Sequence, residues 1–380
     1  MTTGRLIRVL HVGKFYPPVP GGMEQVVRLL CENERPTIDS RVLVANKTHE
    51  TVRETVDGVP VTRVASVGQI GSVGLCPTLP LWLRRLSADV IVVHEPNPVA
   101  LVSMVLARPR AAVVVWFHSE VVRPRWKYRL LYRPFLRAVL RRAVRIIVSS
   151  PELARHALEL QDFRDKCVVV PFGVDTARLA PTDGVLARAK DIRAEHGTPL
   201  ILFVGRLVAY KGVDVLLRAV VGLAATTLIV GAGPLRAPLE RLARELGLSR
   251  VRFLGDVSDA EVTALYHAAD IFTLPSVTRA EAFGVVQLEA MACGVPVVST
   301  NLRSGVPWVN QHQKTGLVVP PGDAGALRSA FDTLLGDRPR REALGRFARD
   351  LVHRQFTLSR MARMTGDVYR DVLGASASEL

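Results

Sequence analysis

The chain has 380 residues, of which 48% are hydrophobic and 22% are charged. This length exceeds what a single core usually organises and suits two domains, and the apolar content excludes a disordered chain. Its four cysteines form no Cys-x-x-Cys pair and have no histidine at metal-ligand spacing, which argues against a disulfide framework and a structural zinc site.

The predicted elements begin with a strand, a glycine-rich loop and a helix. Residues 7–12 are interpreted as a buried strand rather than a secretory signal, because Arg8 interrupts the apolar stretch and no small-residue cleavage site follows. The loop GKFYPPVPGG then leads into a helix expected over 23–31. The same order returns at 200–204, with the loop GRLVAYKG and a helix expected over 213–221. Two copies predict two nucleotide-binding-like domains.

Buried strands alternate with helical patterns along the rest of the chain, which is typical of parallel sheets covered on both faces. We therefore expect an α/β protein of two Rossmann-like domains whose sheets face across a cleft. The N-terminal domain is expected over 1–172 with a returning helix at 356–380, and the C-terminal domain over 173–355. The longest apolar stretches, 98–107 and 111–117, fall short of the roughly 20 residues that span a bilayer, so we expect a cytoplasmic protein. Further strands are expected at 41–45, 90–93, 113–117, 146–149, 227–230, 251–254, 271–274 and 296–299.

The net charge of +15 is concentrated in residues 1–175, which hold 25 Lys and Arg against 15 Asp and Glu. Within them, residues 123–145 contain nine basic residues, four aromatic ones and no acidic one. Such a stretch predicts peripheral contact with an anionic membrane, with Arg137, Arg141 and Arg142 among the contacting residues. The alternative is a solvated helix face whose leucines pack in the N-terminal domain.

The most informative motif is LPSVTRAEAFGVVQLEAMACGVPVV at 274–298. A strand ends in it, a polar loop follows, and 283–292 is predicted to be a helix whose first-turn N–H groups favour a bound anion. Glu281 precedes this helix and Glu289 lies inside it. With a phosphate at the helix end, the two carboxylates can reach hydroxyls on either side of it. Alternatively, they only cap and solvate the helix.

A second motif, VGRLVAYKG at 204–212, places two cations after a buried strand. Arg206 and Lys211 are expected at the carboxyl edge of the sheet, where open α/β folds bind ligands, and they suit a diphosphate. The alternative is a pair of solvated surface cations. Gly231, in a Gly-Ala-Gly-Pro segment after another strand, is a weaker candidate for the same edge.

The N-terminal half contributes two further candidates. Gly22 follows Gly21 at the mouth of the first helix, where missing side chains let the backbone approach a ligand closely. His118 follows the strand AAVVVWF at the carboxyl edge, where it can bind a ligand hydroxyl or orient a reaction. The alternative for His118 is a polar loop residue.

Together the motifs resemble one family. GGME near the start, FHSE after a strand, VGRLVAYKG, and EAFGVVQLEAMACGVPVVST followed by KTGLVVPPGD are similar, in order and over nearly the whole chain, to the retaining GT-B glycosyltransferases of family 4. This group includes bacterial mannosyltransferases, so the resemblance implies a hexosyltransferase with a nucleotide diphosphate-sugar donor. One departure is Trp308 in SGVPWVN, where many relatives carry a glutamate, and we assign it no role.

The resemblance also implies roles for matching residues. Arg206 and Lys211 would hold the donor diphosphate. Glu281 would bind hydroxyls of the transferred sugar, His118 would contact that sugar near the reacting centre, and Glu289 would hold the ribose. The other donor-binding positions that it implies are Gly22, Gly205, Gly231, Leu254, Phe283, Gly284 and Val285.

The chain contains no Asp-x-Asp motif, and so no obvious carboxylate pair for a metal that bridges the diphosphate. We therefore expect a metal-independent enzyme without a cofactor, in which cationic side chains and a helix terminus take the place of the metal. Because no strong base candidate faces the acceptor, we favour front-side displacement with retention.

The opening HVGKFYPPVPGGMEQVV and the segments TRAEAFGVVQLEAMA and SGVPWVN are most similar to bacterial mannosyl- or rhamnosyltransferases of surface polysaccharide assembly. This favours GDP-mannose or a related GDP-sugar, a saccharide or polyprenyl-diphosphate-linked acceptor at the inner face of the cell membrane, and no nucleic-acid partner. A UDP-sugar donor, a sugar-nucleotide epimerase and a non-catalytic membrane-binding relative stay open. A nicotinamide-dependent dehydrogenase is disfavoured because the first loop lacks Gly-x-Gly-x-x-Gly.

Overall fold

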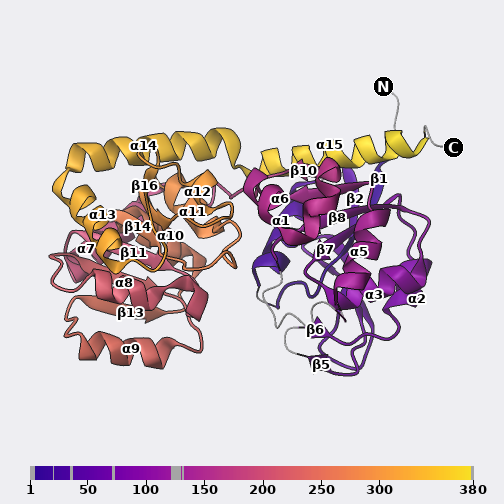
Figure 1. The fold of residues 1–380 in the computed structure, drawn as a ribbon, viewed down its shortest axis with the longest axis horizontal. Helices are drawn as coiled ribbons and strands as arrows, with labels where there is room; N and C mark the ends of the chain where they lie inside the picture. The colour runs from indigo at the N-terminus through magenta and orange to yellow at the C-terminus, as the bar shows by residue number, and fades with distance from the viewer. Residues whose placement is uncertain are drawn as a thin grey trace. The chain divides into compact units, whose positions relative to one another are not determined.

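The computed structural model describes residues 5–19, 21–34, 37–70, 73–120, 130 and 132–377. The chain divides into two compact units, one of Met1–Phe172 with Leu358–Leu380 and one of Gly173–Thr357. Each is built on a mainly or wholly parallel sheet with helices packed on it, so the predicted α/β fold class is confirmed (Figure 1). Among the described helices, none is both long and apolar enough to cross a membrane.

The first unit has an eight-stranded sheet in the order β10-β9-β8-β7-β1-β2-β4-β3, parallel except for the pairing of β3 with β4. The sequence patterns predict the central strands, whereas β3, β4 and β10 are not foreseen. A two-stranded ribbon, β5–β6, lies outside the sheet. The strands are β1 Ile7–Val12, β2 Ile38–Ala45, β3 Val52–Val56, β4 Val59–Val64, β5 Gln69–Ile70, β6 Val73–Gly74, β7 Val90–Glu95, β8 Ala112–Phe117, β9 Arg145–Val148 and β10 Cys167–Val169.

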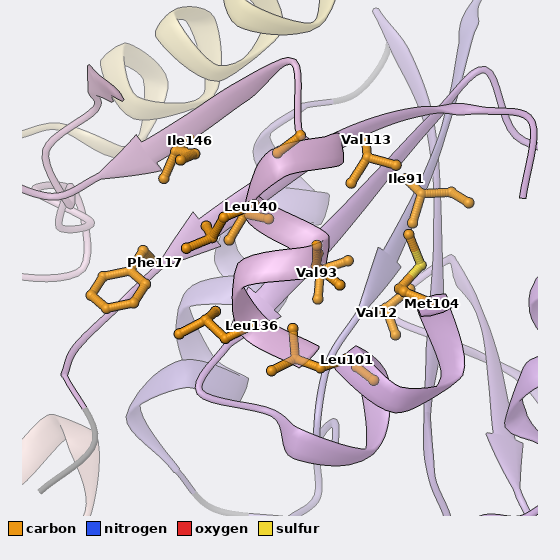
Figure 2. Close-up of a cluster of buried hydrophobic side chains, with 14 of the residues drawn as sticks. Val12, Ile91, Val93, Leu101, Met104, Val113, Phe117, Leu136, Leu140 and Ile146 are labelled. Carbon is orange, nitrogen blue, oxygen red and sulfur yellow. The ribbon is translucent and has the colours of Figure 1, made fainter. Parts of the chain in front are cut away.

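Helices cover both faces of this sheet. On one face, α3 and α5 bury their apolar sides against alternate residues of the central strands, as Figure 2 shows for Val93, Leu101 and Leu136. On the other face, α1 packs on β2 and β4 and is joined by the returning helix α15. The helices are α1 Gly22–Asn33, α2 Leu79–Arg85, α3 Pro98–Ala107, α5 Arg133–Arg142, α6 Pro151–His156, the 3-10 segment η2 Leu158–Lys166 and α15 Leu358–Ala377.

The second unit has a fully parallel six-stranded sheet in the order β13-β12-β11-β14-β15-β16. Its core joins α8 and α13 to the central strands through residues such as Phe203, Leu216 and Phe331. The strands are β11 Leu200–Val204, β12 Thr226–Val230, β13 Val251–Gly255, β14 Ile271–Leu274, β15 Val297–Thr300 and β16 Gly316–Val319. The helices are α7 Asp183–His196, the 3-10 turn η3 Ala209–Lys211, α8 Val213–Ala219, α9 Arg236–Glu245, α10 Asp259–Ala268, α11 Val285–Ala292, α12 Val306–Val309, α13 Ala324–Gly336 and α14 Arg338–Gln355.

One predicted helix start differs from the structure for a local reason. The helix expected over 283–292 begins at Val285, because Gly284 takes the left-handed conformation with φ of 73° and acts as its N-cap. The helix expected from residue 213 begins there, and Lys211 in the preceding loop closes the 3-10 turn η3. Gly212 follows it with φ of 65°, and α8 begins one residue later.

Candidate active site

The loops after three neighbouring strands meet at the carboxyl edge of the second sheet, because β11 lies between β12 and β14. Lys211 follows β11 and Glu281 follows β14, and the structure brings them into direct contact: Lys211 Nζ is 2.6 Å from Glu281 Oε2. Both side chains are largely buried, at 10% and 9% exposure. Lys211 is therefore not the solvated surface cation of the alternative interpretation, and Glu281 does more than cap a helix.

Further hydrogen bonds hold this pair in place. Ser276 Oγ donates to Glu281 Oε2 over 2.9 Å. The loop that carries Lys211 is tied to the loop that carries Glu281 by a backbone bond, in which Val277 N donates to Tyr210 O over 2.8 Å. Arg206, in contrast, is exposed and lies in the loop after β11, at the same edge. Thus one of the two predicted cations is fixed, whereas the other faces solvent.

Gly231 lies where the loop after β12 touches the loop after β11. A Cβ at Gly231 would come within 2.2 Å of the carbonyl oxygen of Gly205, and φ at Gly231 is 121°, so no other residue fits. Backbone bonds continue this contact, with Gly205 N donating to Val230 O and Gly231 N to Gly255 O. Leu254, half-buried at the end of β13, directly precedes Gly255. The Gly-Ala-Gly-Pro segment that contains Gly231 thus lies at the carboxyl edge of the second sheet.

Helix α11 begins directly after Gly284 and offers the free N–H groups of its first turn at this edge. Phe283 is different, because its side chain is buried and its ring centroid lies 6.2 Å from that of Trp308 and 6.3 Å from that of Phe356. Only the backbone of Phe283 is available to a ligand. The same cluster gives Trp308 a packing role, which the sequence did not assign.

Glu289 is held on both carboxylate oxygens. Arg178 donates to Oε1 over 2.9 Å, and Tyr266 Oη donates to Oε2 over 2.8 Å. Burial raises the pKa of Glu289, although Tyr266 and Arg178 oppose that rise. A ribose at Glu289 would therefore share the carboxylate with these two donors. Neither Arg178 nor Tyr266 was among the predicted residues.

In the first unit, His118 lies at the carboxyl end of β8 with 7% exposure. Its ring stacks on Trp116 and Phe172, each at 5.6 Å between centroids, and its Nε2 is 2.9 Å from His94 Nδ1. Burial, together with the charge of Lys14, lowers the pKa of His118 to about 3. Burial thus keeps the imidazole of His118 neutral, and His118 is not an ordinary polar loop residue.

Gly22 is the first residue of α1, and Gly21 before it has an extended backbone. A Cβ at Gly21 would collide with the Glu24 side chain, whereas a Cβ at Gly22 would meet no atom within 4 Å. Packing in the described structure therefore gives no reason for a glycine at position 22.

The basic segment is described only in part, since residues 121–129 and 131 lie outside the described ranges. Within α5, Leu136, Val139 and Leu140 are buried in the core of the unit, as the alternative interpretation expects for the leucines, and they are not available to enter a membrane interface. Arg137 forms an ion pair with Asp162 at 2.7 Å. Arg141 and Arg142 are both exposed.

Sequence reasoning missed Ser276, Arg178 and Tyr266, because a serine, arginine or tyrosine outside a motif carries no signal of its own. It also missed His94 at the end of β7, although His94 shares with His118 the strand-end position that made His118 a candidate.

Each unit is built on a mainly or wholly parallel sheet, and a buried Lys–Glu pair, close-packed glycine loops and a helix N-terminus lie at one edge of the second sheet. Such an arrangement is typical of the GT-B class of α/β proteins. The model for glycosyl transferases group 1 matches residues 187–351, and that for the glycosyl transferase 4-like domain matches residues 21–173. The chain is 34% identical over 359 residues to the D-rhamnosyltransferase WbpZ of Pseudomonas aeruginosa, with 92% of each protein covered. The O-antigen chain mannosyltransferase C of Escherichia coli is 31% identical over 374 residues, 97% of this chain and 99% of that one. The protein belongs to this glycosyltransferase family, as its motifs predicted.

Solved structures agree on the fold. Sucrose-phosphate synthase from Thermosynechococcus elongatus superposes with a TM-score of 0.79 at 22% identity, over 97% of this chain and 100% of that one. Anabaena HepE in complex with UDP and glucose gives a TM-score of 0.77 at 19% identity, over 96% of this chain and 100% of that one.

A further relative in sequence is the GDP-mannose-dependent phosphatidylinositol monomannoside mannosyltransferase of Mycobacterium tuberculosis. It is 33% identical over 319 residues, 77% of this chain and 80% of that one.

Proposed function

We propose that this glycosyltransferase moves a mannose-type hexose from a GDP-sugar to a saccharide or lipid-linked saccharide, with retention and without a metal ion. The observation that carries the proposal is the buried contact of Lys211 with Glu281 at the carboxyl edge of the second sheet. Two relatives that match nearly full length, a D-rhamnosyltransferase and an O-antigen mannosyltransferase, support the sugar class.

In this proposal, the donor diphosphate binds where Lys211, Arg206 and the first turn of α11 meet. Glu281 already neutralises Lys211, so Arg206 and the helix terminus supply the net positive potential that attracts a diphosphate. As the bond to the sugar breaks, negative charge grows on the diphosphate. Preorganised donors such as Lys211 Nζ then stabilise the transition state more than the ground state.

The remaining residues orient the donor. Glu281 has a second carboxylate oxygen, Oε1, that can accept bonds from hydroxyls of the transferred sugar. The backbone amides of Phe283, Gly284 and Val285 face the phosphate or the sugar, and Glu289 accepts the ribose hydroxyls beside Tyr266. Gly231 and Gly205 keep the loop backbone close to the nucleotide, next to Leu254.

The first unit contributes His118 and Gly22. A neutral imidazole at the end of β8 suits a hydrogen bond to a sugar hydroxyl better than general acid catalysis, because the low pKa of His118 leaves the ring without the second, acidic proton near pH 7. Gly22 leaves open space at the start of α1, which fits a glycine that a phosphate or acceptor approaches.

A UDP-sugar is the competing donor. It is favoured by Anabaena HepE, whose structures contain UDP and UDP-glucose, although the likeness to that protein extends to the fold alone. GDP-mannose is favoured by the mycobacterial relative, which is described as dependent on it and is more similar in sequence.

The acceptor side of the proposal places the enzyme on the inner face of the cell membrane. The basic face of α5, with Arg141 and its neighbours Arg137 and Arg142, would meet anionic lipid headgroups. Since the buried leucines of α5 belong to the unit's own core, this contact would rest on charge.

A two-part experiment tests the proposal. Thermal unfolding is measured with GDP, UDP, GDP-mannose and UDP-glucose at 100 times the dissociation constant, where binding stabilises by about 2.7 kcal/mol. The favoured donor is then supplied with a lipid-linked saccharide, and the anomeric configuration of the product is determined by NMR. Stabilisation by guanine nucleotides and a retained configuration are expected. Stabilisation by uridine nucleotides alone would replace GDP by UDP, and an inverted product would refute retention.

A further inference from the structure

Three side chains that can bind a metal ion meet between β1 and α1 in the first unit. His11 lies on β1, Cys31 lies in the last turn of α1, and Glu34 is the C-cap of that helix. Cys31 and Glu34 are three residues apart and therefore lie on the same side of the helix. All three side chains are buried, and one ligand atom from each lies within 4.8 Å of the other two. Imidazole, thiolate and carboxylate are the ligands that zinc takes in proteins.

Two polar atoms of this cluster have no hydrogen-bond partner. Within the described residues, neither His11 Nε2 nor Glu34 Oε1 has one, although the two residues are 0% and 2% exposed. Buried polar atoms in folded proteins are nearly always paired with protein, water or an ion. Two such atoms that belong to neighbouring side chains therefore point to a ligand that both of them bind.

An ion pair between a charged His11 and Glu34 is the alternative. Charge-assisted hydrogen bonds are about 2.7–2.9 Å long, whereas His11 Nε2 is 3.4 Å from Glu34 Oε2. Such a pair would also leave the Cys31 thiol without a role. A divalent ion binds the nitrogen, the sulfur and the oxygen together. Its two positive charges balance one thiolate and one carboxylate, so the buried site carries no net charge.

The spacing of the ligand atoms suits a tetrahedral ion after a small adjustment. Zinc bonds of about 2.0–2.3 Å place the ligand atoms about 3.3–3.8 Å apart. The 3.4 Å between His11 Nε2 and Glu34 Oε2 already lies in this range. The widest separation in the cluster, at most 4.8 Å, would close by about 1 Å to reach that geometry. The second carboxylate oxygen of Glu34 is available as a fourth donor.

Neighbouring side chains orient two of the three ligands. In metal sites, a histidine that binds through one nitrogen usually donates its other N–H to a fixed acceptor. His11 Nδ1 is 3.0 Å from His94 Nε2, which can accept that bond and leave His11 Nε2 for the ion. Ser40 Oγ on β2 donates to Glu34 Oε2 over 2.5 Å. Both contacts are in place without the ion.

We propose that His11, Cys31 and Glu34 bind one zinc ion, which fixes the C-terminal end of α1 on β1. Spacing along the chain argues against a zinc site, since Cys31 comes 20 residues after His11, and only the fold brings the two together. The ion belongs to the first unit, whereas the residues proposed to hold the donor diphosphate belong to the second. The zinc site is therefore independent of the proposed function and of its metal-free transfer step.

Metal content tests the site directly. The full chain, without a histidine tag, is produced in medium that contains zinc, purified without chelator and analysed by inductively coupled plasma mass spectrometry. One equivalent of zinc per chain is expected. Because the ligands are buried, this zinc should stay bound when the folded protein is dialysed against EDTA and be lost after unfolding in urea with EDTA. Absence of zinc from the purified protein, and again after refolding with zinc, would overturn the proposal.

Two variants remove one ligand each, Cys31→Ala and Glu34→Gln, and both should lose the zinc. Cys76→Ala is the matched control, because Cys76 is a second buried free thiol of the same unit and should not affect zinc content. The urea midpoint of the wild type and of Cys76→Ala should rise when zinc is present during refolding, and that of Cys31→Ala should stay unchanged. A full equivalent of zinc in both ligand variants would overturn the assignment of these residues.

Cobalt identifies the ligand that carries sulfur. After unfolding with chelator, the protein is refolded with Co²⁺, and the absorption band of thiolate-bound cobalt is expected in the wild type and in Cys76→Ala but not in Cys31→Ala. The same band in Cys31→Ala would place the metal on another thiol and overturn the proposal. Since none of these measurements needs a sugar donor, absence of transfer with every sugar nucleotide would refute the proposed function and leave the zinc site standing.

Discussion

Lys211 and Glu281 come from loops after two neighbouring strands, yet their charged atoms lie 2.6 Å apart and nine-tenths buried. Removing one partner of a buried ion pair leaves the other charge buried without compensation, which lowers the free energy of unfolding by about 3–5 kcal/mol. Lys211→Met and Glu281→Gln should each lower the free energy of unfolding and reduce transfer by roughly 100-fold or more. The double variant should recover most of the stability but none of the transfer, as measured by urea unfolding and initial rates.

The control is an ion pair of similar separation whose side chains are more exposed. Arg188 and Glu261 lie 2.7 Å apart at 43% and 27% exposure, and Arg188→Met should change stability by about 1 kcal/mol at most and leave transfer intact. Full activity in a folded Glu281→Gln protein would remove this pair from the site.

Gly22→Ala separates a ligand effect from a folding effect. No atom lies within 4 Å of the added methyl group, and alanine favours a helix over glycine, so stability should stay level or rise by up to about 1 kcal/mol. Transfer should nevertheless fall at least tenfold if substrate approaches this backbone. Gly184→Ala, near the start of α7 and equally unobstructed, should match the stability change and keep full activity. Equal rates in the two variants would count against a close approach at Gly22.

Transfer should continue in excess EDTA, because the chain has no Asp-x-Asp motif. In the proposed function, Lys211 and Arg206 take the place of a metal at the diphosphate. Initial rates are compared before and after dialysis against chelator. Complete loss of activity that magnesium or manganese restores would contradict the metal-independent mechanism.

The buried carboxyl of Glu95 should make the free energy of unfolding depend on pH. Burial raises the pKa of this carboxyl to about 7, against the bonds donated by Tyr132 Oη and Asn97 N. The folded state thus favours neutral Glu95, and this contribution is full below pH 4.5 and is lost as the pH rises to about 7. Its size is about 3 kcal/mol. His94 and His118, whose pKa values are lowered, give the opposite slope, so the measured quantity is the difference between wild type and Glu95→Gln.

Unfolding free energies at pH 4.5 to 7.5 should show that Glu95→Gln gains stability relative to wild type as the pH rises. In the control variant Glu50→Gln, which changes an exposed loop residue, the unfolding free energy should follow that of the wild type at every pH. A constant difference between wild type and Glu95→Gln would show that Glu95 is not the titrating group.

The membrane proposal predicts salt-sensitive binding to anionic vesicles. Each Lys or Arg near such a surface contributes about 1 kcal/mol, and screening acts over ~8 Å at physiological ionic strength. Changing Arg137, Arg141 and Arg142 to Ser should reduce co-sedimentation with vesicles that contain phosphatidylserine. Because Arg137 is paired with Asp162, the larger part of the loss should come from the exposed Arg141 and Arg142. Equal binding to neutral and anionic vesicles would move the membrane contact elsewhere.

The sequence predicts the central strands well, because fully buried parallel strands are continuous apolar runs. The bounds of β1, β11 and β14 agree residue for residue with the structure. The β3–β4 hairpin was not predicted, since β3 is largely exposed and reads as a polar loop. For the site, strand-end position identified Lys211 and Glu281 separately.

What the sequence does not provide is contact between distant residues. That Lys211 pairs with Glu281, that Gly231 touches Gly205, and that Glu289 is shared by Arg178 and Tyr266 depends on strand order and register. The hydrogen-bonded histidines His11, His94 and His118 are the clearest case. They are 83 and 24 residues apart, and only the stagger between adjacent strands brings their rings together.

The returning helix α15 has a consequence for protein synthesis. The first unit includes the 20 residues of α15, in which Tyr369 fills the space beside His11 at 6.4 Å between ring centroids and Asp371 pairs with Arg145 at 2.9 Å. They leave the ribosome after the whole of the second unit. A nascent chain that has reached residue 357 thus carries every residue of the second unit while the first still has an open face over β1. We therefore expect the second unit to complete its folding before the first, against the usual order in which the N-terminal part of a chain folds first.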